Sequence, residues 1–218
     1  MIELYLSALV TFFVVIDPPG CAPIYAGLTK GASAAHRRAM AIRAVVVAAI
    51  ILFVFAAVGE GILKALGVSL SAFRIAGGIM LFLIALEMVF EKRTERREDR
   101  AAKVASTPEI EDVSIFPMAM PMIAGPGSIA SVMLMMSRNH GVDRVAVVLA
   151  ALATILILTL LALLAAGPLM KLLGARIEAV ITRILGVLLG ALAVQFVIDG
   201  IRGIGFAGLG LAAVAPAA

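Results

Sequence analysis

Charged residues are scarce in this chain of 218 residues, and they are unevenly placed along it. They make up 15% of the sequence, whereas globular domains carry about 25%. Hydrophobic residues make up 63%, and the mean hydropathy is +1.14. Several apolar stretches continue without a charge for roughly the 20 residues that a helix needs to cross a bilayer. The composition therefore predicts an integral membrane protein rather than a soluble enzyme.

Organised sets of residues for metal, nucleotide or disulfide chemistry are also lacking. Cys21 is the single cysteine, which excludes an internal disulfide. No group of His, Cys, Asp and Glu has the spacing of metal ligands, and no phosphate-binding or dinucleotide glycine motif is present. The net charge of +4 comes mostly from basic residues in short loops between apolar runs, as is usual for membrane helices. We therefore expect no enzyme activity, no cofactor, no metal and no nucleic-acid partner.

Six apolar segments follow one another along the chain. They cover residues 4–28, 39–59, 72–90, 115–137, 145–167 and 180–201. The third and fourth are separated by a stretch of mixed charge, 91–112, that we interpret as a cytoplasmic linker with no core to bury. The Gly/Ala-rich tail, 204–218, is expected to be flexible. The predicted fold is an all-α integral membrane protein with six transmembrane helices.

Basic residues predict the orientation of these helices. If the loops after the first, third and fifth segments share one face, that face holds 13 Lys and Arg residues and the other holds five. The positive-inside rule places the richer face in the cytoplasm and both termini outside it. We expect a multi-pass protein of the cell inner (plasma) membrane.

The two halves of the sequence resemble each other at a nearly constant offset. A shift of 107 places Pro19-Gly20 on Pro126-Gly127, and Lys64 on Lys171. Each half, 1–90 and 113–203, contains three crossings, so the halves must enter the membrane from opposite faces. That arrangement is an inverted-topology repeat, a plan common among secondary transporters.

The first segment of each half is interrupted near its middle by proline and glycine. Unwound backbone leaves unpaired N–H and C=O groups, so it survives in a membrane only when packed in protein or lining a wet cavity. Each interruption also begins a new helix, with Asp17 before Pro18 in one half and Gly125 before Pro126 in the other. Helix N-termini favour anions, so we expect the two breaks to form a midplane site for a carboxylate. The alternative is a pair of kinked helices without a ligand.

The candidate substrate-binding residues come from these breaks and from one polar position on the last segment. They are Asp17, Pro18, Pro19, Gly20, Cys21 and Pro23 in the first half, and Pro121, Gly125, Pro126, Gly127, Ser128 and Gln195 in the second. Asp17 could orient an amino group or carry a proton, as intramembrane acids often do, or it could only cap the half-helix. Glu87 and Asp199 are interpreted as acids at the membrane rims, and Arg74 as an interfacial residue.

Together, five stretches of this sequence resemble the MarC family of inner-membrane proteins. They are Ile16–Ile24, Arg74–Ile79, Pro117–Pro121, Ala124–Ile129 and Thr182–Gly186. The resemblance implies six helices, a plasma-membrane location and a relation to small neutral amino-acid transporters, the SnatA-type members of which move glycine and alanine. Pro19 and Cys21 depart from the family pattern, which usually has an aliphatic residue and an asparagine at these positions.

These observations predict a secondary transporter, an exporter or exchanger, for small neutral amino acids or similar zwitterionic solutes. A translocase for an anionic lipid-linked headgroup is an alternative, because the same helix N-termini could accept a phosphate. A non-transporting membrane scaffold is a second alternative. The expected partners are the small-molecule substrate and the lipid bilayer, and a homo-oligomer is left open.

Overall fold

A computed structural model of the chain describes residues 1–90, 92, 96, 99 and 112–204. Every regular element in these ranges is a helix. The first half contains α1 (Ile2–Ile16), α2 (Pro18–Leu28), α3 (Ala34–Ala65) and α4 (Leu70–Val89). The second contains the π-type helix η1 (Ser114–Ile123), α6 (Pro126–Arg138), α7 (Val142–Leu164) and α8 (Ala166–Ile204). Most of the predicted charged linker and the predicted tail lie outside the described residues.

Each predicted apolar segment corresponds to a helix, or in one case to a bent pair of helices, that is long and apolar enough to cross a membrane. Five stretches qualify as spans by length and composition: Ile2–Leu28, Ala34–Ala65, Leu70–Val89, Val142–Leu164 and Val180–Ile204. A sixth span results if η1 and α6, which meet at an angle of 50°, are counted as one broken crossing. The fold is therefore that of an all-helical membrane protein with five or six spans and one broken helix pair.

Local sequence explains where the long helices begin and end. Ser33 and Ser69 cap α3 and α4, because their hydroxyl oxygens accept the amides of His36 (3.2 Å) and Ala72 (3.1 Å). Gly67, between the two helices, has a positive φ of 68°, a conformation that glycine adopts without the steric cost of a Cβ. The turn that joins α3 to α4 thus follows from the Ser69 cap and one glycine, Gly67.

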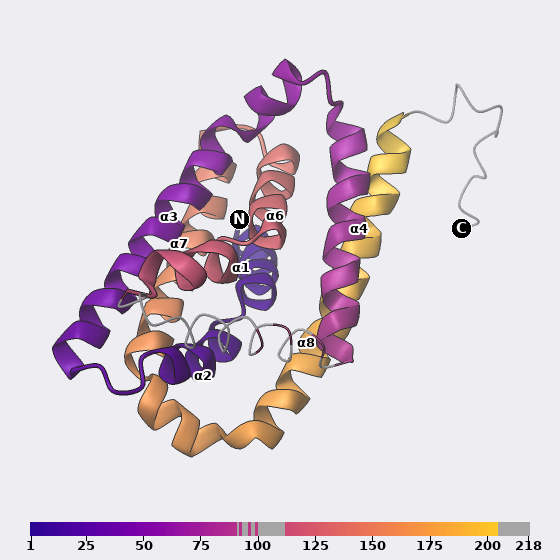
Figure 1. Ribbon diagram of the computed structural model, residues 1–218. Coiled ribbons are helices and arrows are strands. Elements are labelled where there is room, and N and C mark those ends of the chain that lie inside the picture. The colour runs from indigo at the N-terminus through magenta and orange to yellow at the C-terminus, as the bar shows by residue number, and fades with distance from the viewer. Residues whose placement is uncertain (91, 93–95, 97–98, 100–111, 205–218) are drawn as a thin grey trace.

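The first break is narrower than the sequence suggests, and the second is wider. The first consists of Asp17 alone, because Pro18 and Pro19 occupy helix positions where a missing N–H has no partner to lose. The second extends back from Gly125 through η1, in which Phe116 and Met120 have extended backbone angles. Figure 1 shows η1 lying across the middle of the molecule, with α6 continuing from it toward the end where α3 meets α4.

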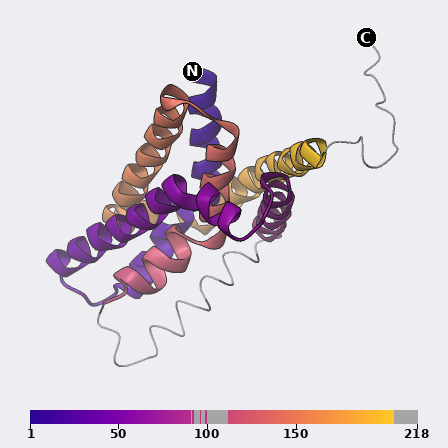
Figure 2. The same ribbon diagram turned by 90° about the horizontal axis from the view of Figure 1, so that it is seen from above.

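Helices α4 and α8 pack against each other over most of the length of α4 and form a pair beside the other helices (Figures 1 and 2). Glycines bring the two backbones close. A Cβ added at Gly78 would lie 2.8 Å from the carbonyl oxygen of Ala193, and one at Gly200 would lie 2.9 Å from that of Ser71. Small residues at such contacts are the usual way for membrane helices to associate.

We predict that Gly78→Ala weakens the α4–α8 contact. The new methyl group would overlap the backbone of α8, and overpacking of this kind costs about 1–3 kcal/mol. Gly61→Ala is the matched control, because no atom outside its own helix backbone lies within 4 Å of the added Cβ. Thermal unfolding followed by circular dichroism in detergent should show a lower midpoint for Gly78→Ala than for Gly61→Ala. Equal midpoints would contradict the contact.

Contacts between the two halves are reciprocal. Helices α1 and α2 of the first half pack on α7 of the second, and α3 of the first half packs on η1 and α6 of the second. The third helices of the two halves, α4 and α8, pack on each other. The broken first helix of each half therefore contacts the second helix of the other half, and the two third helices contact each other, as in two copies related by a two-fold axis.

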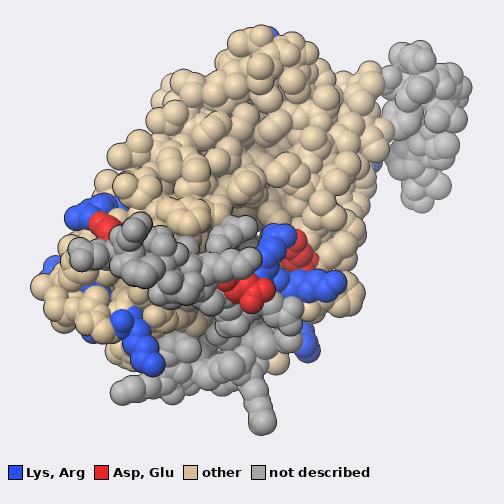
Figure 3. Space-filling model, viewed as in Figure 1, with Lys and Arg blue, Asp and Glu red and all other residues tan. Residues whose placement is uncertain are grey.

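Charged side chains gather toward one end of the molecule. On the face shown in Figure 3, Lys, Arg, Asp and Glu lie mainly near the lower end, and a broad uncharged surface lies above them. Large apolar side chains are exposed on the long helices, including Val46, Ile50 and Val54 on α3, which are 50–59% exposed. An apolar belt of this kind suits contact with lipid rather than water.

Candidate functional site

Asp17 caps the half-helix α2, as the sequence predicts. Its backbone lies in the left-handed region (φ 59°), and its carboxylate accepts the amide of Gly20 at 3.1 Å. The side chain is buried, with 3% of the residue exposed. A Cβ at Gly20 would overlap the carboxylate of Asp17, so the cap requires glycine at this position.

The rest of the first break is packed in protein. Cys21 is fully buried, and its thiol donates a long hydrogen bond of 3.5 Å to the carbonyl of Ile16. Pro18 is buried at the first position of α2, Pro19 follows it, and Pro23 lies one turn further along the helix. This environment supports a packing role for the thiol, because no second cysteine exists.

The second break begins α6 in a similar way but without a side-chain cap. Gly125 precedes the helix in an extended conformation, and Pro126 is its first residue. A Cβ at Gly125 would overlap the carbonyl oxygen of Pro121, and one at Gly127 would overlap the end of the Ile84 side chain. The start of α6 is therefore closely packed against η1 on one side and α4 on the other.

A cavity of about 560 Å³ opens at the start of α6. Its walls come from α1, α4, η1, α6 and the segment after α4; they are Val15, Ile84, Glu87, Arg96, Phe116, Pro121, Met122, Gly125, Pro126, Gly127 and Ser128. The structure thus brings together the five candidate residues of the second break. The candidates of the first break do not line this cavity, although Val15, two residues before Asp17, does.

The two breaks are nevertheless neighbours. A Cβ on Gly127 would lie 3.6 Å from the Cγ1 atom of Val15, so the start of α6 faces the end of α1. Asp17 follows that end directly, but its carboxylate is turned to its own helix and holds the amide of Gly20. The first break therefore lies beside the cavity, and residues of the second break line it.

Glu87 is the acid in the cavity wall. The sequence predicted an acid at a membrane rim here, but not that it would lie at the candidate site. Its carboxylate forms a two-point ion pair with the Arg96 guanidinium, with both N–O distances 2.7 Å. The Glu87 side chain is 24% exposed. A signal existed in the sequence: Glu87 follows Ile84 by three residues, so the two share a helix face. No local sequence pattern, however, indicates that this face packs against α6.

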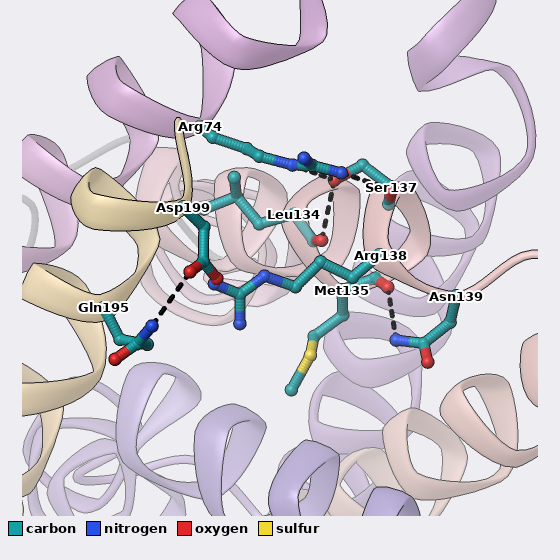
Figure 4. Close-up of polar contacts among 8 residues, drawn as sticks. All are labelled: Arg74, Leu134, Met135, Ser137, Arg138, Asn139, Gln195 and Asp199. Atoms are coloured by element: carbon teal, nitrogen blue, oxygen red, sulfur yellow. Dashed lines mark hydrogen bonds and ion pairs between the residues drawn. The ribbon is translucent and has the colours of Figure 1, made fainter. Parts of the chain in front are cut away.

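Gln195 lies away from the cavity, in a second polar group at the other end of α6 (Figure 4). The residue is exposed on α8, and its side-chain amide donates to the Oδ1 atom of Asp199 at 2.8 Å. Asp199 in turn forms an ion pair with Arg138 at the C-terminus of α6. The structure therefore does not bring Gln195 to the other candidate residues.

This group of residues ties α6 to the α4–α8 pair. Arg138 pairs with Asp199 of α8 and lies 4.0 Å from the centroid of the Phe196 ring. Arg74 of α4 donates to the carbonyl oxygen of Ser137 at 2.7 Å. A basic residue at a helix C-terminus is also favoured by the helix dipole. The structure thus adds contacts between helices for Asp199 and Arg74 that the sequence did not predict.

The apolar helices, the broken pair and the buried polar cap together define a multi-pass integral membrane protein. Comparison with protein families gives the particular group: the family described as MarC family integral membrane protein matches residues 2–205. The chain belongs to the MarC family, as its motifs suggest.

Curated relatives from distant organisms span nearly the same length. The chain is 38% identical to UPF0056 membrane protein MJ1677 of Methanocaldococcus jannaschii, over 93% of this chain and 98% of the relative. It is 34% identical to UPF0056 membrane protein YhcE of Escherichia coli, over 94% of each. It is 32% identical to YvbG of Bacillus subtilis, over 93% of this chain and 96% of the relative. No solved structure matches the chain significantly.

Proposed function

We propose that this protein is a secondary transporter of small neutral amino acids or similar zwitterionic solutes. The observation that carries the proposal is the cavity at the start of α6, where helix amides and an acid share one wall. To bind a zwitterion, a site needs a group that accepts its carboxylate and a group that accepts its ammonium within a few ångströms of each other. A volume of about 560 Å³ is ample for a small amino acid.

The substrate carboxylate is assigned to the N-terminus of α6, near Gly127 and Ser128. The first amides of a helix have no partner within the helix, and the dipole favours negative charge there. The substrate ammonium is assigned to Glu87. Asp17 was expected either to hold the ammonium or to relay a proton, but its absence from the cavity wall favours Glu87, whose carboxylate oxygens can accept further hydrogen bonds beside those from Arg96.

Alternating access is proposed to arise from two inverted three-helix repeats, 1–90 and 113–203, with six crossings and both termini outside the cytoplasm. The reciprocal packing of the halves supports this arrangement. The polar contacts of Arg138 with Asp199 join α6 to the α4–α8 pair at one end, while the cavity with Glu87 lies at the other. Rocking of the pair against the remaining helices would exchange the open and closed ends.

Glu87 in the cavity wall also favours a transporter of zwitterions over a translocase for anionic headgroups. A translocase for an anionic lipid-linked headgroup would need a wall of positive charge, but Glu87 balances Arg96 in this cavity. A zwitterion fits a wall of balanced charge better than an anion does. The non-transporting scaffold remains as the outcome of a negative transport experiment.

The proposal is tested by counterflow into liposomes of inner-membrane lipid. Vesicles containing purified protein and an excess of unlabelled alanine or glycine should accumulate labelled alanine transiently and with saturation, faster than protein-free vesicles. Measurement at two pH values reports proton coupling at the same time. If correctly inserted protein gives no uptake over a full amino-acid panel, the substrate assignment is wrong.

A further inference from the structure

A second cavity lies at the charged end of the molecule, away from the break in η1 and α6. It has a volume of about 410 Å³ and lies between the end of α2, the start of α3 and the turn from α7 to α8. Its wall consists of Tyr25, Ala26, Thr29, Ala34, Arg37, Arg38, Leu163, Leu164, Ala166, Gly167 and Pro168. Among the residues that the structure describes, this wall therefore contains two arginines and no acid.

Both guanidinium groups lack a counter-charge in the described part of the chain. Arg37 and Arg38 form no ion pair with any acid there, although they are adjacent in sequence and repel each other. Asp112, whose charge acts on Tyr25 in this wall, pairs with Arg43 instead and accepts the amide of Ser114 at 2.8 Å. Burial raises the pKa of Asp112, but these hydrogen bonds and Arg43 outweigh that effect and hold the pKa below its ordinary value. This carboxylate therefore stays charged and occupied.

The first residues of α3 are basic, whereas acidic residues are the ones that stabilise the start of a helix. Acids stabilise the positive N-terminal end of a helix dipole, and cations destabilise it. The first turn of α3 contains no acid, and His36, Arg37 and Arg38 follow the Ser33 cap. An external anion between the two arginines would offset both their mutual repulsion and their conflict with the dipole.

The remaining contacts fix the shape of the cavity. The Tyr25 hydroxyl donates to the carbonyl of Arg37 and so joins α2 to α3. The carbonyl of Tyr25 accepts both the amide (3.0 Å) and the hydroxyl (2.8 Å) of Thr29, which satisfies that carbonyl at the C-terminal end of α2. The first turn of α8 supplies a second helix N-terminus to the wall.

We propose that this cavity binds a phosphate-bearing anion through Arg37 and Arg38. Guanidinium groups bind phosphate through paired hydrogen bonds, which suits a site built from two of them. The source favoured by the wall is the headgroup of an anionic phospholipid. Leu163 and Leu164 line the cavity, and Leu164 continues into the exposed apolar surface of α7 with Leu161, Leu158 and Ile157, where an acyl chain would lie. Basic pockets between membrane helices hold lipid headgroups in this way.

The experiment measures the thermal unfolding midpoint of the full chain in dodecylmaltoside with added lipid or salt. Phosphatidylglycerol should raise the midpoint by roughly 2–4 °C, whereas phosphatidylcholine should not, because a ligand that binds the folded state stabilises it. The double variant Arg37→Gln/Arg38→Gln should lose this rise. The control Arg144→Gln/Arg202→Gln also removes two charges, from exposed arginines outside the cavity wall, and should keep it.

Inorganic phosphate, compared with chloride at equal ionic strength, distinguishes the two sources. A rise with phosphatidylglycerol alone identifies the lipid headgroup. An equal rise with phosphate identifies a soluble anion at the same arginines. The proposal is overturned if phosphatidylglycerol and phosphatidylcholine have the same effect and phosphate has none. It is equally overturned if the Arg37→Gln/Arg38→Gln variant keeps the rise.

Discussion

Glu87→Gln is expected to weaken alanine exchange in liposomes by roughly 10- to 100-fold in apparent affinity. A hydrogen bond to a charged group contributes about 1.5–3 kcal/mol, and each 1.4 kcal/mol corresponds to about a factor of ten. The amide keeps the shape of the side chain but cannot offer the ammonium a negative charge. Protein insertion and yield should not change, since glutamine fits the same partly exposed position. The measurement is the substrate concentration that gives half-maximal counterflow.

Glu60→Gln is the matched control for this variant. Glu60 is also an acid on a membrane-spanning helix, but its partner is Lys64 of the same helix at 3.0 Å, and it does not line the cavity. Exchange should therefore be normal. Asp17→Asn separates the two assignments for the ammonium: a loss of affinity confined to Asp17→Asn, with Glu87→Gln unaffected, would return that role to Asp17. If all three variants exchange alanine normally, the cavity is not the transport site.

Gly20→Ala is expected to open the first break. The added methyl group cannot coexist with the Asp17 carboxylate in its capping position. Losing the cap and leaving a buried acceptor without its donor together cost about 2–4 kcal/mol. The adjacent Cys21 is fully buried and is the only thiol in the chain, so it reports this opening directly. The labelling rate of Cys21 by a maleimide in mild detergent should rise at least about tenfold, at about 1.4 kcal/mol per factor of ten.

Gly27→Ala provides the comparison within the same helix. No atom outside the helix's own nearby backbone lies within 4 Å of the Cβ that this change adds, and the gain in helix propensity is the same. Its labelling rate should match that of the unaltered protein. Equal rates for Gly20→Ala and Gly27→Ala would show that the close fit between Gly20 and Asp17 does not hold α2 in place.

The spans were predictable because the membrane imposes one requirement, an apolar length, that can be read from sequence alone. Asp17 with Pro18 and Gly125 with Pro126 were also readable, since caps and N-terminal prolines act within one turn of helix. Local signals placed the start of each half-helix at the correct residue. The extent of the second break was not readable, because the extended residues Phe116 and Met120 lie within an otherwise apolar run.

Contacts between distant helices account for most of what the sequence did not reveal. Glu87, Arg138 and Asp199 are ordinary membrane-edge residues when each segment is considered alone. Their partners lie nine residues away for Glu87 and 61 residues apart for Arg138 and Asp199. Only the packing of α6 against the α4–α8 pair determines which of these charges face a cavity and which join two helices. A pattern read one segment at a time does not contain that packing.

Helix α8 connects the two cavities through α4. It begins in the wall of the cavity that contains Arg37 and Arg38, and it runs for 39 residues to the part that packs on α4, which lines the cavity at the start of α6. Thermodynamic linkage would then make lipid composition a regulator: if anion binding near Arg37 changes the affinity for substrate, substrate must change the affinity for the anion by the same factor. If both proposals hold, the anionic lipid content of the membrane would set the substrate concentration at which the protein works, and saturating substrate would in turn retain that lipid.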